Sequence, residues 1–303
     1  MLKSPFIFRG HSDSTWELRP PAWRQDGQKT LSPLADLFRQ SVDGQLRQDS
    51  EKSPGRDFDS EDTNRFEWAL QQVQELFAVK TFHDIVDEQG LEVPLFPKMH
   101  FEDDSWYRRI GWMFSFVTYT SVFTRELLEL MALAQHHGVP TRLLDWTRDP
   151  RIAMFFAADN DTLQPSNDDA SHLAVWAVNR QVLKQAHVEI LTVPRFSNSF
   201  VHAQEALFTY VAPGETLNWF HQYGTWPSLV DLHEKYMYKI THPPLMKFTL
   251  PRIEGDKLLT FLQREHITRA RLMPTYQSAA STTRTTWKLW RNEFGRFDWE
   301  LGW

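Results

Sequence analysis

Two histidines and a pair of opposite charges lie close together in the run QHHGVPTRLLDWT, residues 135–147. His136 and His137 precede a Gly-x-Pro turn, and Arg142 and Asp145 interrupt an otherwise apolar stretch. A charged pair in such a stretch is costly to bury unless each charge has a partner. The run therefore predicts either a structural network of ion pairs or a functional site.

Arg9 is a candidate for binding an anion. It closes an apolar segment, and Gly10 after it leaves the guanidinium clear of a following Cβ. The planar guanidinium suits a bidentate contact with phosphate or carboxylate. The alternative is a structural salt bridge to an acid of the central run, such as Asp145. His11 is a candidate acid/base group or ribose contact.

Gln204 and Glu205 directly precede the apolar run 206–211. A carboxylate at the start of a strand near an arginine suits acid/base chemistry, although an ordinary surface glutamate has the same pattern. Because neighbouring residues of a strand point to opposite faces, only one of the two is expected to face a cleft. Gln204 is the stronger candidate, and Asp145 is a further acid.

The histidine pair does not predict a metal site. Adjacent residues on a helix point about 100° apart, so His136 and His137 seldom reach one ion. The sequence has no H-E-x-x-H motif, and it has no cysteine, which excludes thiolate chemistry. We therefore assign no metal ligand.

The elements that hold these residues follow from the apolar patterns. Gly138 stands where a helix C-cap is expected, and Asp149 with Pro150 forms a cap and first turn for the next helix. Arg142 and Asp145 fall on opposite faces of a strand, or on one side of a tight turn. Helical patterns occupy 65–79, 106–123, 124–136, 150–158, 254–266 and 278–290; strand patterns occupy 5–9, 173–178, 189–193, 206–211 and 247–250.

These patterns predict an α+β fold with a mixed sheet and flanking helices. We expect one domain over residues 1–303, with a helical insertion at about 25–125. The net charge of -6 gives no general basic field for nucleic acid. No apolar run approaches the roughly 20 residues of a membrane span, and no secretory leader is evident, so we expect a cytoplasmic protein.

Phosphate-binding glycine motifs are also missing. The chain has 12 glycines and neither a P-loop nor a G-x-G-x-x-G motif. A nucleotide, if bound, must therefore be held by side chains, chiefly arginine and the abundant aromatic residues.

The chain resembles the FRG domain family, a group of mostly bacterial proteins. Phe8-Arg9-Gly10 matches the tripeptide that gives the family its name, and residues 135–147 match its central block. A weaker third block corresponds to residues 203–208, where Glu205 and Ala206 stand in place of the usual Gln and Gly. Family members resemble parts of anti-phage and toxin systems, which implies a defence context and an antitoxin or defence partner.

The order of the blocks also resembles ADP-ribosyltransferases. In that resemblance Arg9 holds the phosphates of NAD, Thr141 or Thr147 supports the nicotinamide side, and Glu205 or Gln204 contacts the ribose. It implies transfer to a macromolecular acceptor, either protein or nucleic acid. The residues expected to bind NAD are Arg9, His11, His136, Thr141, Arg142 and Thr147; Gln204, Glu205 and Asp145 are the candidate catalytic groups.

Two other functions remain open. A non-catalytic module for a nucleotide or a single nucleic-acid strand would use the same charges, with tryptophans stacking on bases. A phosphodiester hydrolase ranks last, because no acidic metal cluster is evident. We predict one cleft formed by residues distant in sequence: Arg9, His136, Arg142, Asp145 and Gln204.

Overall fold

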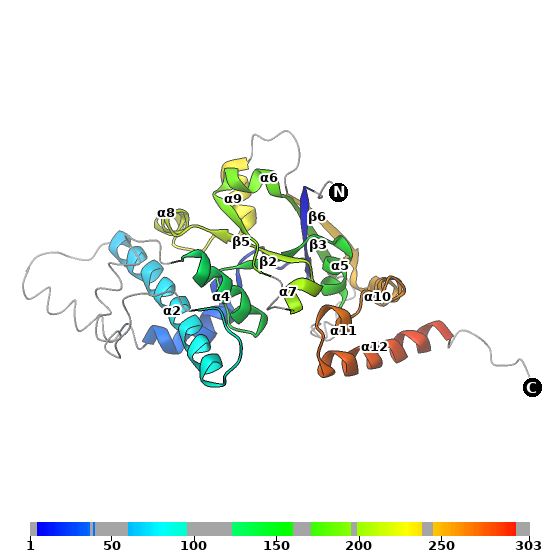
Figure 1. Ribbon diagram of the computed structural model, residues 1–303. Helices are drawn as coiled ribbons and strands as arrows, with labels where there is room; N and C mark the ends of the chain where they lie inside the picture. The colour runs from blue at the N-terminus through cyan, green and yellow to red at the C-terminus, as the bar shows by residue number, and fades with distance from the viewer. Residues whose placement is uncertain are drawn as a thin grey trace, which may run out of the picture.

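The computed structural model describes residues 5–36, 39, 60–95, 123–159, 171–194, 199–237 and 245–294. These residues form one six-stranded sheet in the order β4-β5-β2-β1-β3-β6, with helices on both faces (Figure 1). The strands are β1 (Phe6–His11), β2 (Leu144–Thr147), β3 (His172–Asn179), β4 (Val188–Leu191), β5 (Ala206–Val211) and β6 (Leu245–Pro251).

The α+β class is confirmed, but the prediction of a mixed sheet is wrong. Each of the five strand pairings in the described residues is antiparallel. Apolar runs identify strands but carry no information about their direction, which depends on how the connections cross the sheet. The predicted strands correspond to β1, β3, β4, β5 and β6, whereas β2 is a short strand that carries a charge.

The helices are α2 (Ser60–Glu88), α4 (Arg125–His136), α5 (Pro150–Ala158), α6 (Arg180–Leu183), α7 (Ser199–Ala203), α8 (Pro213–Tyr223), α9 (Leu229–Met237), α10 (Gly255–Arg264), α11 (Arg269–Leu272) and α12 (Tyr276–Phe294). Short 3-10 helices are η1 (Pro21–Trp23), η3 (Lys184–Ala186) and η4 (Arg252–Glu254), and residues 25–36 are helical. Among the described residues no helix has the length and apolar character that crossing a membrane requires.

The helix boundaries around the central run coincide with capping residues, of which Gly138 and Asp149 were predicted from the sequence. Thr124 caps α4 by accepting a hydrogen bond from the Leu127 amide, and Asp149 caps α5 by accepting one from the Arg151 amide. Gly138 follows the end of α4 with a φ of 92°, a left-handed conformation that glycine adopts without strain. The chain therefore leaves α4 sharply and enters β2 within a few residues.

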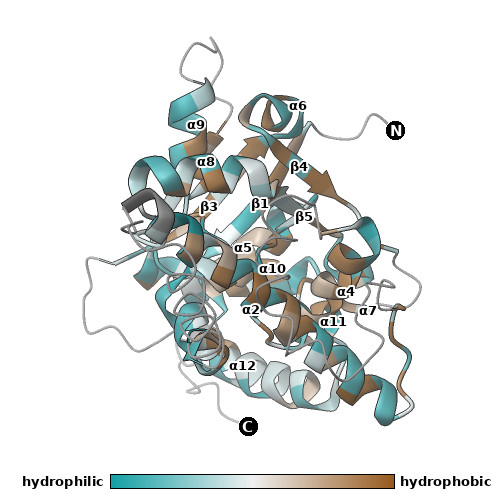
Figure 2. Cartoon of the chain, turned by 90° about the vertical axis from the view of Figure 1, so that its left-hand side faces the viewer, coloured by the Kyte–Doolittle hydropathy of each residue, from teal (hydrophilic) through white to brown (hydrophobic). Residues whose placement is uncertain are grey.

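Two hydrophobic clusters lie on the two sides of the sheet. One contains side chains of α2, α4 and α8 with Ile7, Trp146 and Trp176. The other joins α5, α10 and α12 to Leu173 and, at its margin, Val175. Leu173 and Val175 therefore alternate with Trp176 and Val178 between opposite faces of β3, as period-two geometry requires. In Figure 2 hydrophobic colour dominates β4.

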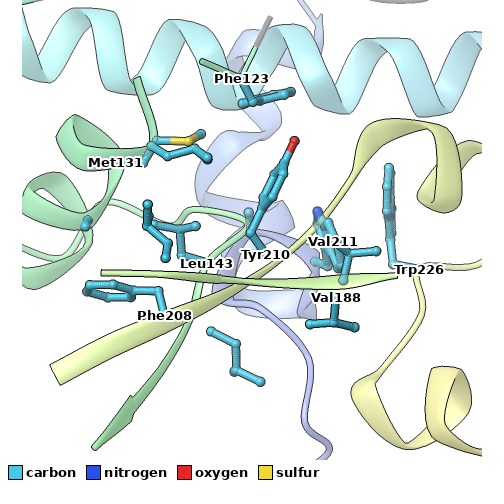
Figure 3. Close-up of a cluster of buried hydrophobic side chains, with 14 of the residues drawn as sticks. Phe123, Met131, Leu143, Val188, Phe208, Tyr210, Val211 and Trp226 are labelled. Atoms are coloured by element: carbon cyan, nitrogen blue, oxygen red, sulfur yellow. The ribbon is translucent and has the colours of Figure 1, made fainter. Parts of the chain in front are cut away.

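The described part of the predicted insertion is mostly helical, with residues 89–95 after α2 as its main irregular stretch. Residues 25–36 and α2 lie within the predicted range of about 25–125, and α2 contributes Trp68, Leu76 and other buried side chains to the core. The helix predicted over 106–123 lies almost wholly outside the described residues. In Figure 3 the hydroxyl of Tyr210, on β5, points toward Phe123 at the edge of the first cluster.

Candidate functional site

The centre of the candidate site is an ion pair between neighbouring strands. Arg9 Nη1 lies 2.7 Å from Asp145 Oδ1 and donates a 2.8 Å hydrogen bond to the Asp145 backbone oxygen. The register between β1 and β2 joins Phe8 to Thr147, immediately beside this contact. The Arg9 side chain is 11% exposed and that of Asp145 is 48% exposed. The salt bridge considered from the sequence is therefore present, at a position that solvent reaches.

Burial and the positive charge of Arg9 act in opposite directions on the Asp145 carboxylate. Burial raises its pKa, but the charge and hydrogen bond of Arg9 outweigh that effect and lower the pKa to about 2. Asp145 is consequently ionised throughout the ordinary pH range, and it is a weak proton acceptor.

His11 completes the contacts of Arg9. Arg9 Nε donates a 2.9 Å hydrogen bond to His11 Nε2. A guanidinium can only donate hydrogen bonds, so His11 Nε2 must be the acceptor and carries no proton. The neutral His11 ring therefore has its proton on Nδ1. Burial, together with the nearby positive charges of Arg9 and Arg24, lowers the pKa of His11 to about 2. His11 is thus a neutral imidazole in this site.

A chain of side-chain hydrogen bonds holds Asp145 from the other direction. Gln135 Nε2 donates to Asp145 Oδ1 at 3.2 Å, and Thr141 Oγ1 donates to Gln135 Oε1 at 2.5 Å. Thr141 itself is fully buried. The structure therefore places Thr141 behind the site, where it orients Gln135.

Arg142 also lies in the core, with a side chain that is 0% exposed. Its Nε is 2.8 Å from Glu75 Oε2 of α2, and its guanidinium carbon lies 3.6 Å from the centre of the Phe123 ring. Glu75 Oε1 accepts further hydrogen bonds from Trp23 and Gln71. This buried pair fastens α2 to the segment before β2, beneath the surface of the candidate site.

His136 stands at the end of α4 among aromatic rings. Its ring centre is 5.8 Å from that of Phe208 and 6.2 Å from that of Phe200. Burial lowers its pKa, and the charge of Asp145 acts in the opposite direction. Its Nε2 is buried and makes no hydrogen bond to the described residues.

Gln204 and Glu205 meet β2 at its last residue. Thr147 Oγ1 donates a 2.8 Å hydrogen bond to the Gln204 backbone oxygen, and Gln204 Nε2 donates to the Leu272 oxygen at 3.2 Å. Glu205 is exposed and has a left-handed φ of 47°. Since β5 begins after both residues, the alternation expected from a strand does not apply to them.

The structure brings Arg9, His11 and Asp145 into direct contact and links Thr141 to them through Gln135. Arg142 is packed in the core, and Gln204 and Glu205 lie beyond the far end of β2. Arg24 was not predicted as a site residue, although its charge acts on Asp145, His11 and Arg9. Gln135 was also unassigned, although it begins the central run. Within the described residues no group of three acidic or histidine side chains is arranged to hold a metal ion.

Comparison with known proteins supports the family resemblance. The family model of the FRG domain matches residues 111–166, which include α4, the central run, β2 and α5. No curated protein and no solved structure matches the chain. The Phe8-Arg9-Gly10 tripeptide and the third block lie outside the matched residues, although Arg9 contacts Asp145 within them. Over residues 111–166, the chain is therefore similar to the FRG domain.

Proposed function

We propose that this protein binds NAD and transfers its ADP-ribosyl group to a macromolecular acceptor. The observation that carries the proposal is the strand order β5-β2-β1 in the middle of the sheet (Figure 1). It makes neighbours of the strand with Arg9, the strand with Asp145 and Thr147, and the strand that Glu205 precedes. The resemblance to ADP-ribosyltransferases requires these three blocks to meet on one ligand.

Arg9 is the proposed contact for the phosphates of NAD. Its contacts with Asp145 and His11 use Nη1 and Nε, so a phosphate would bind at Nη2. The three contacts fix the plane of the guanidinium before the ligand arrives, which reduces the entropy lost on binding. Asp145 would act as a positioning residue for Arg9, and neutral His11 would leave the positive charge of the site on arginine.

Glu205 is the proposed acid for the transfer step. In that step the bond from ribose C1′ to the nicotinamide nitrogen breaks, and nicotinamide leaves with the bonding electrons. A nucleophile of the acceptor bonds to C1′ and loses its proton to solvent. A carboxylate holding a ribose hydroxyl would stabilise the positive charge that develops on the sugar. Glu205 suits this role better than Asp145, because the Asp145 carboxylate is already neutralised by Arg9.

A second candidate is a nucleotide-binding module without transferase activity. The observation in its favour is the exposed position of Glu205, on a left-handed turn outside the sheet. In this alternative Arg9 and the nearby aromatic residues would bind a nucleotide, and a protein or nucleic-acid partner would use the occupied state as a signal. An antitoxin or another defence component is the corresponding partner in either case.

Transfer from labelled NAD separates the two functions. With a bacterial lysate as acceptor, wild type should label macromolecules, and Glu205→Gln should reduce the rate by at least about 100-fold while its melting temperature stays unchanged. Glu265→Gln is the matched control, because Glu265 is 45% exposed and also faces Arg151. If NAD binds and neither wild type nor control labels any acceptor or releases nicotinamide, the binding module is the better account.

A further inference from the structure

A pocket of about 500 Å³ opens in the segment that follows β1, beside the contacting side chains of Arg9, His11 and Asp145. It is formed by the chain before and after η1 and by the first turn of the helix over 25–36. Its volume lies within the roughly 300–1,000 Å³ of pockets that hold small ligands. Its lining residues are Trp16, Glu17, Arg19, Arg24, Gln25 and Asp26.

Arg24 brings a positive charge to this pocket, and neighbouring groups accept only part of its hydrogen bonds. Its Nε donates a 2.7 Å hydrogen bond to the Arg19 backbone oxygen, and its Nη2 is buried without a hydrogen-bond partner among the described residues. Burial, and then the repulsion of Arg9, lower the pKa of Arg24 to about 10. An arginine nitrogen that is out of water and lacks an acceptor favours an anionic ligand.

Trp16 supplies a flat surface next to that charge. Its side chain is 46% exposed, and its ring meets the His11 ring edge-on at 5.9 Å. The contact with buried His11 orients the indole while leaving part of it accessible. An exposed indole held in this way suits stacking with the base of a nucleotide.

The two carboxylates of the pocket favour a ligand that contains a ribose over a free phosphate. Glu17 is neutralised by Arg19 at 2.9 Å, whereas the charge of Asp26 acts on Arg24. A free phosphate would be repelled by Asp26, so it gains little from this pocket. A ribose would instead donate its hydroxyls to a carboxylate, as acidic residues bind ribose in dinucleotide sites.

We infer that this pocket binds a nucleoside diphosphate, with the phosphates at Arg24, the base on Trp16 and the ribose hydroxyls at Asp26. Its identification with the ADP half of NAD rests on the proposed function, because Arg24 lies close enough to the Arg9 pair to affect both of its charges. Binding of the nucleotide itself does not depend on any transfer reaction.

Isothermal titration of the full chain with ADP tests the inference. ADP should bind wild type, and Arg24→Gln and Trp16→Ala should each weaken binding at least tenfold with little change in melting temperature. The matched controls are Lys257→Gln, an exposed cation of α10, and Trp290→Ala, a 52% exposed indole of α12; both should bind as wild type does. Absence of ADP binding to wild type, or binding by both pocket variants as tight as by wild type, would overturn the inference. If Arg24→Gln unfolds, Trp16→Ala decides alone.

Two further ligands define which groups are recognised. Pyrophosphate and adenosine should each bind at least tenfold more weakly than ADP, since each lacks part of the proposed contacts. Pyrophosphate binding as tight as that of ADP would reject the role of Trp16.

Failure of this inference is distinguishable from failure of the proposed function. If NAD is turned over and neither pocket variant changes its KM, the transferase stands and the pocket assignment is wrong. If ADP binds through Arg24 and Trp16 and NAD is not turned over, the pocket stands and the transferase is wrong.

Discussion

Arg9 contacts Asp145 twice through one nitrogen, because Nη1 lies 2.7 Å from the carboxylate oxygen and 2.8 Å from the backbone oxygen of the same residue. The Arg9 side chain therefore joins β1 to β2. The backbone register between these two strands is a single residue pair, Phe8 with Thr147. The contact that fixes a candidate ligand site also holds two central strands together.

Replacing Arg9 with alanine should lower both stability and ligand binding. The substitution leaves the Asp145 carboxylate without its cation and His11 Nε2 without its donor. We expect a loss of about 1–3 kcal/mol in the free energy of unfolding, less than the roughly 3–5 for a fully buried pair, because Asp145 is half exposed. Urea denaturation measures the change. An unchanged denaturation midpoint would show that the pair contributes nothing to the fold.

The free energy of unfolding should fall as the pH decreases below about 6.5, because His11 is protonated more readily in the unfolded chain. Its pKa is lowered to about 2 in the folded chain from an ordinary value of 6.5, so the unfolded state binds more protons throughout that interval. Stability then rises with pH between the two values, by at most about 1.4 kcal/mol per pH unit. Denaturation at pH 7 and pH 5 should show a loss on the order of 1–2 kcal/mol in wild type beyond that in His11→Gln. Equal losses would contradict a buried neutral His11.

Asp145 should add a second decline at lower pH. Its pKa is lowered from 3.8 to about 2, so its contribution is complete above about 3.8 and disappears as the pH falls through 2. Because the carboxylate is half exposed, solvent screening makes this contribution small. The comparison of wild type with Asp145→Asn between pH 5 and pH 2 measures it. If the stability difference between the two proteins does not narrow as the pH falls, the ionised Asp145 carboxylate is not stabilised by Arg9.

The Arg142–Glu75 pair should be a larger structural determinant than the Arg9 pair. Both side chains are 0% exposed, so Arg142→Met leaves a buried carboxylate unpaired and should cost about 3–5 kcal/mol. Replacing both residues, with Glu75→Leu as the partner change, should recover part of that loss. The four proteins of this double-mutant cycle are compared by denaturation. If the double variant is as unstable as the sum of the single ones, the two side chains are not coupled.

Gly10 should tolerate no side chain. A Cβ at this position would lie 1.9 Å from the Ala153 oxygen and 2.7 Å from the Ala157 nitrogen, both in the backbone of α5. Gly10→Ala must therefore push α5 from the sheet, and a large fall in melting temperature is expected. Gly214→Ala is the matched control, since nothing lies within 4 Å of its Cβ. Similar melting temperatures for the two variants would mean that α5 moves without cost.

Much of the fold was predictable because local patterns dominate it. The caps Thr124 and Asp149, the left-handed Gly138 and the apolar run of β5 each have a local signal, and the structure contains all of them. The strand β2 was harder to predict, because four residues with a central Asp145 do not resemble a strand. Its place is set by pairing with β5 and β1, which are distant in sequence.

The site could be predicted only in part, for the same reason. Arg9 and Asp145 were singled out by charge in apolar surroundings, and they contact each other. Arg142 has the same sequence signal, but its partner Glu75 lies on a helix 67 residues earlier in the chain, and this partner decides that it is a core residue. The role of Gln135 follows from the fold of the turn after α4, which no pattern of residue types specifies.

Binding of NAD to wild type and to Arg9→Lys is the most direct test of the central claim. Lysine keeps the positive charge and loses the planar fork that holds Asp145 and a phosphate together. Isothermal titration should detect NAD binding to wild type and at least tenfold weaker binding to Arg9→Lys, with both proteins folded at the temperature used. No detectable binding of NAD to wild type, or equal affinity in the two proteins, would contradict the account.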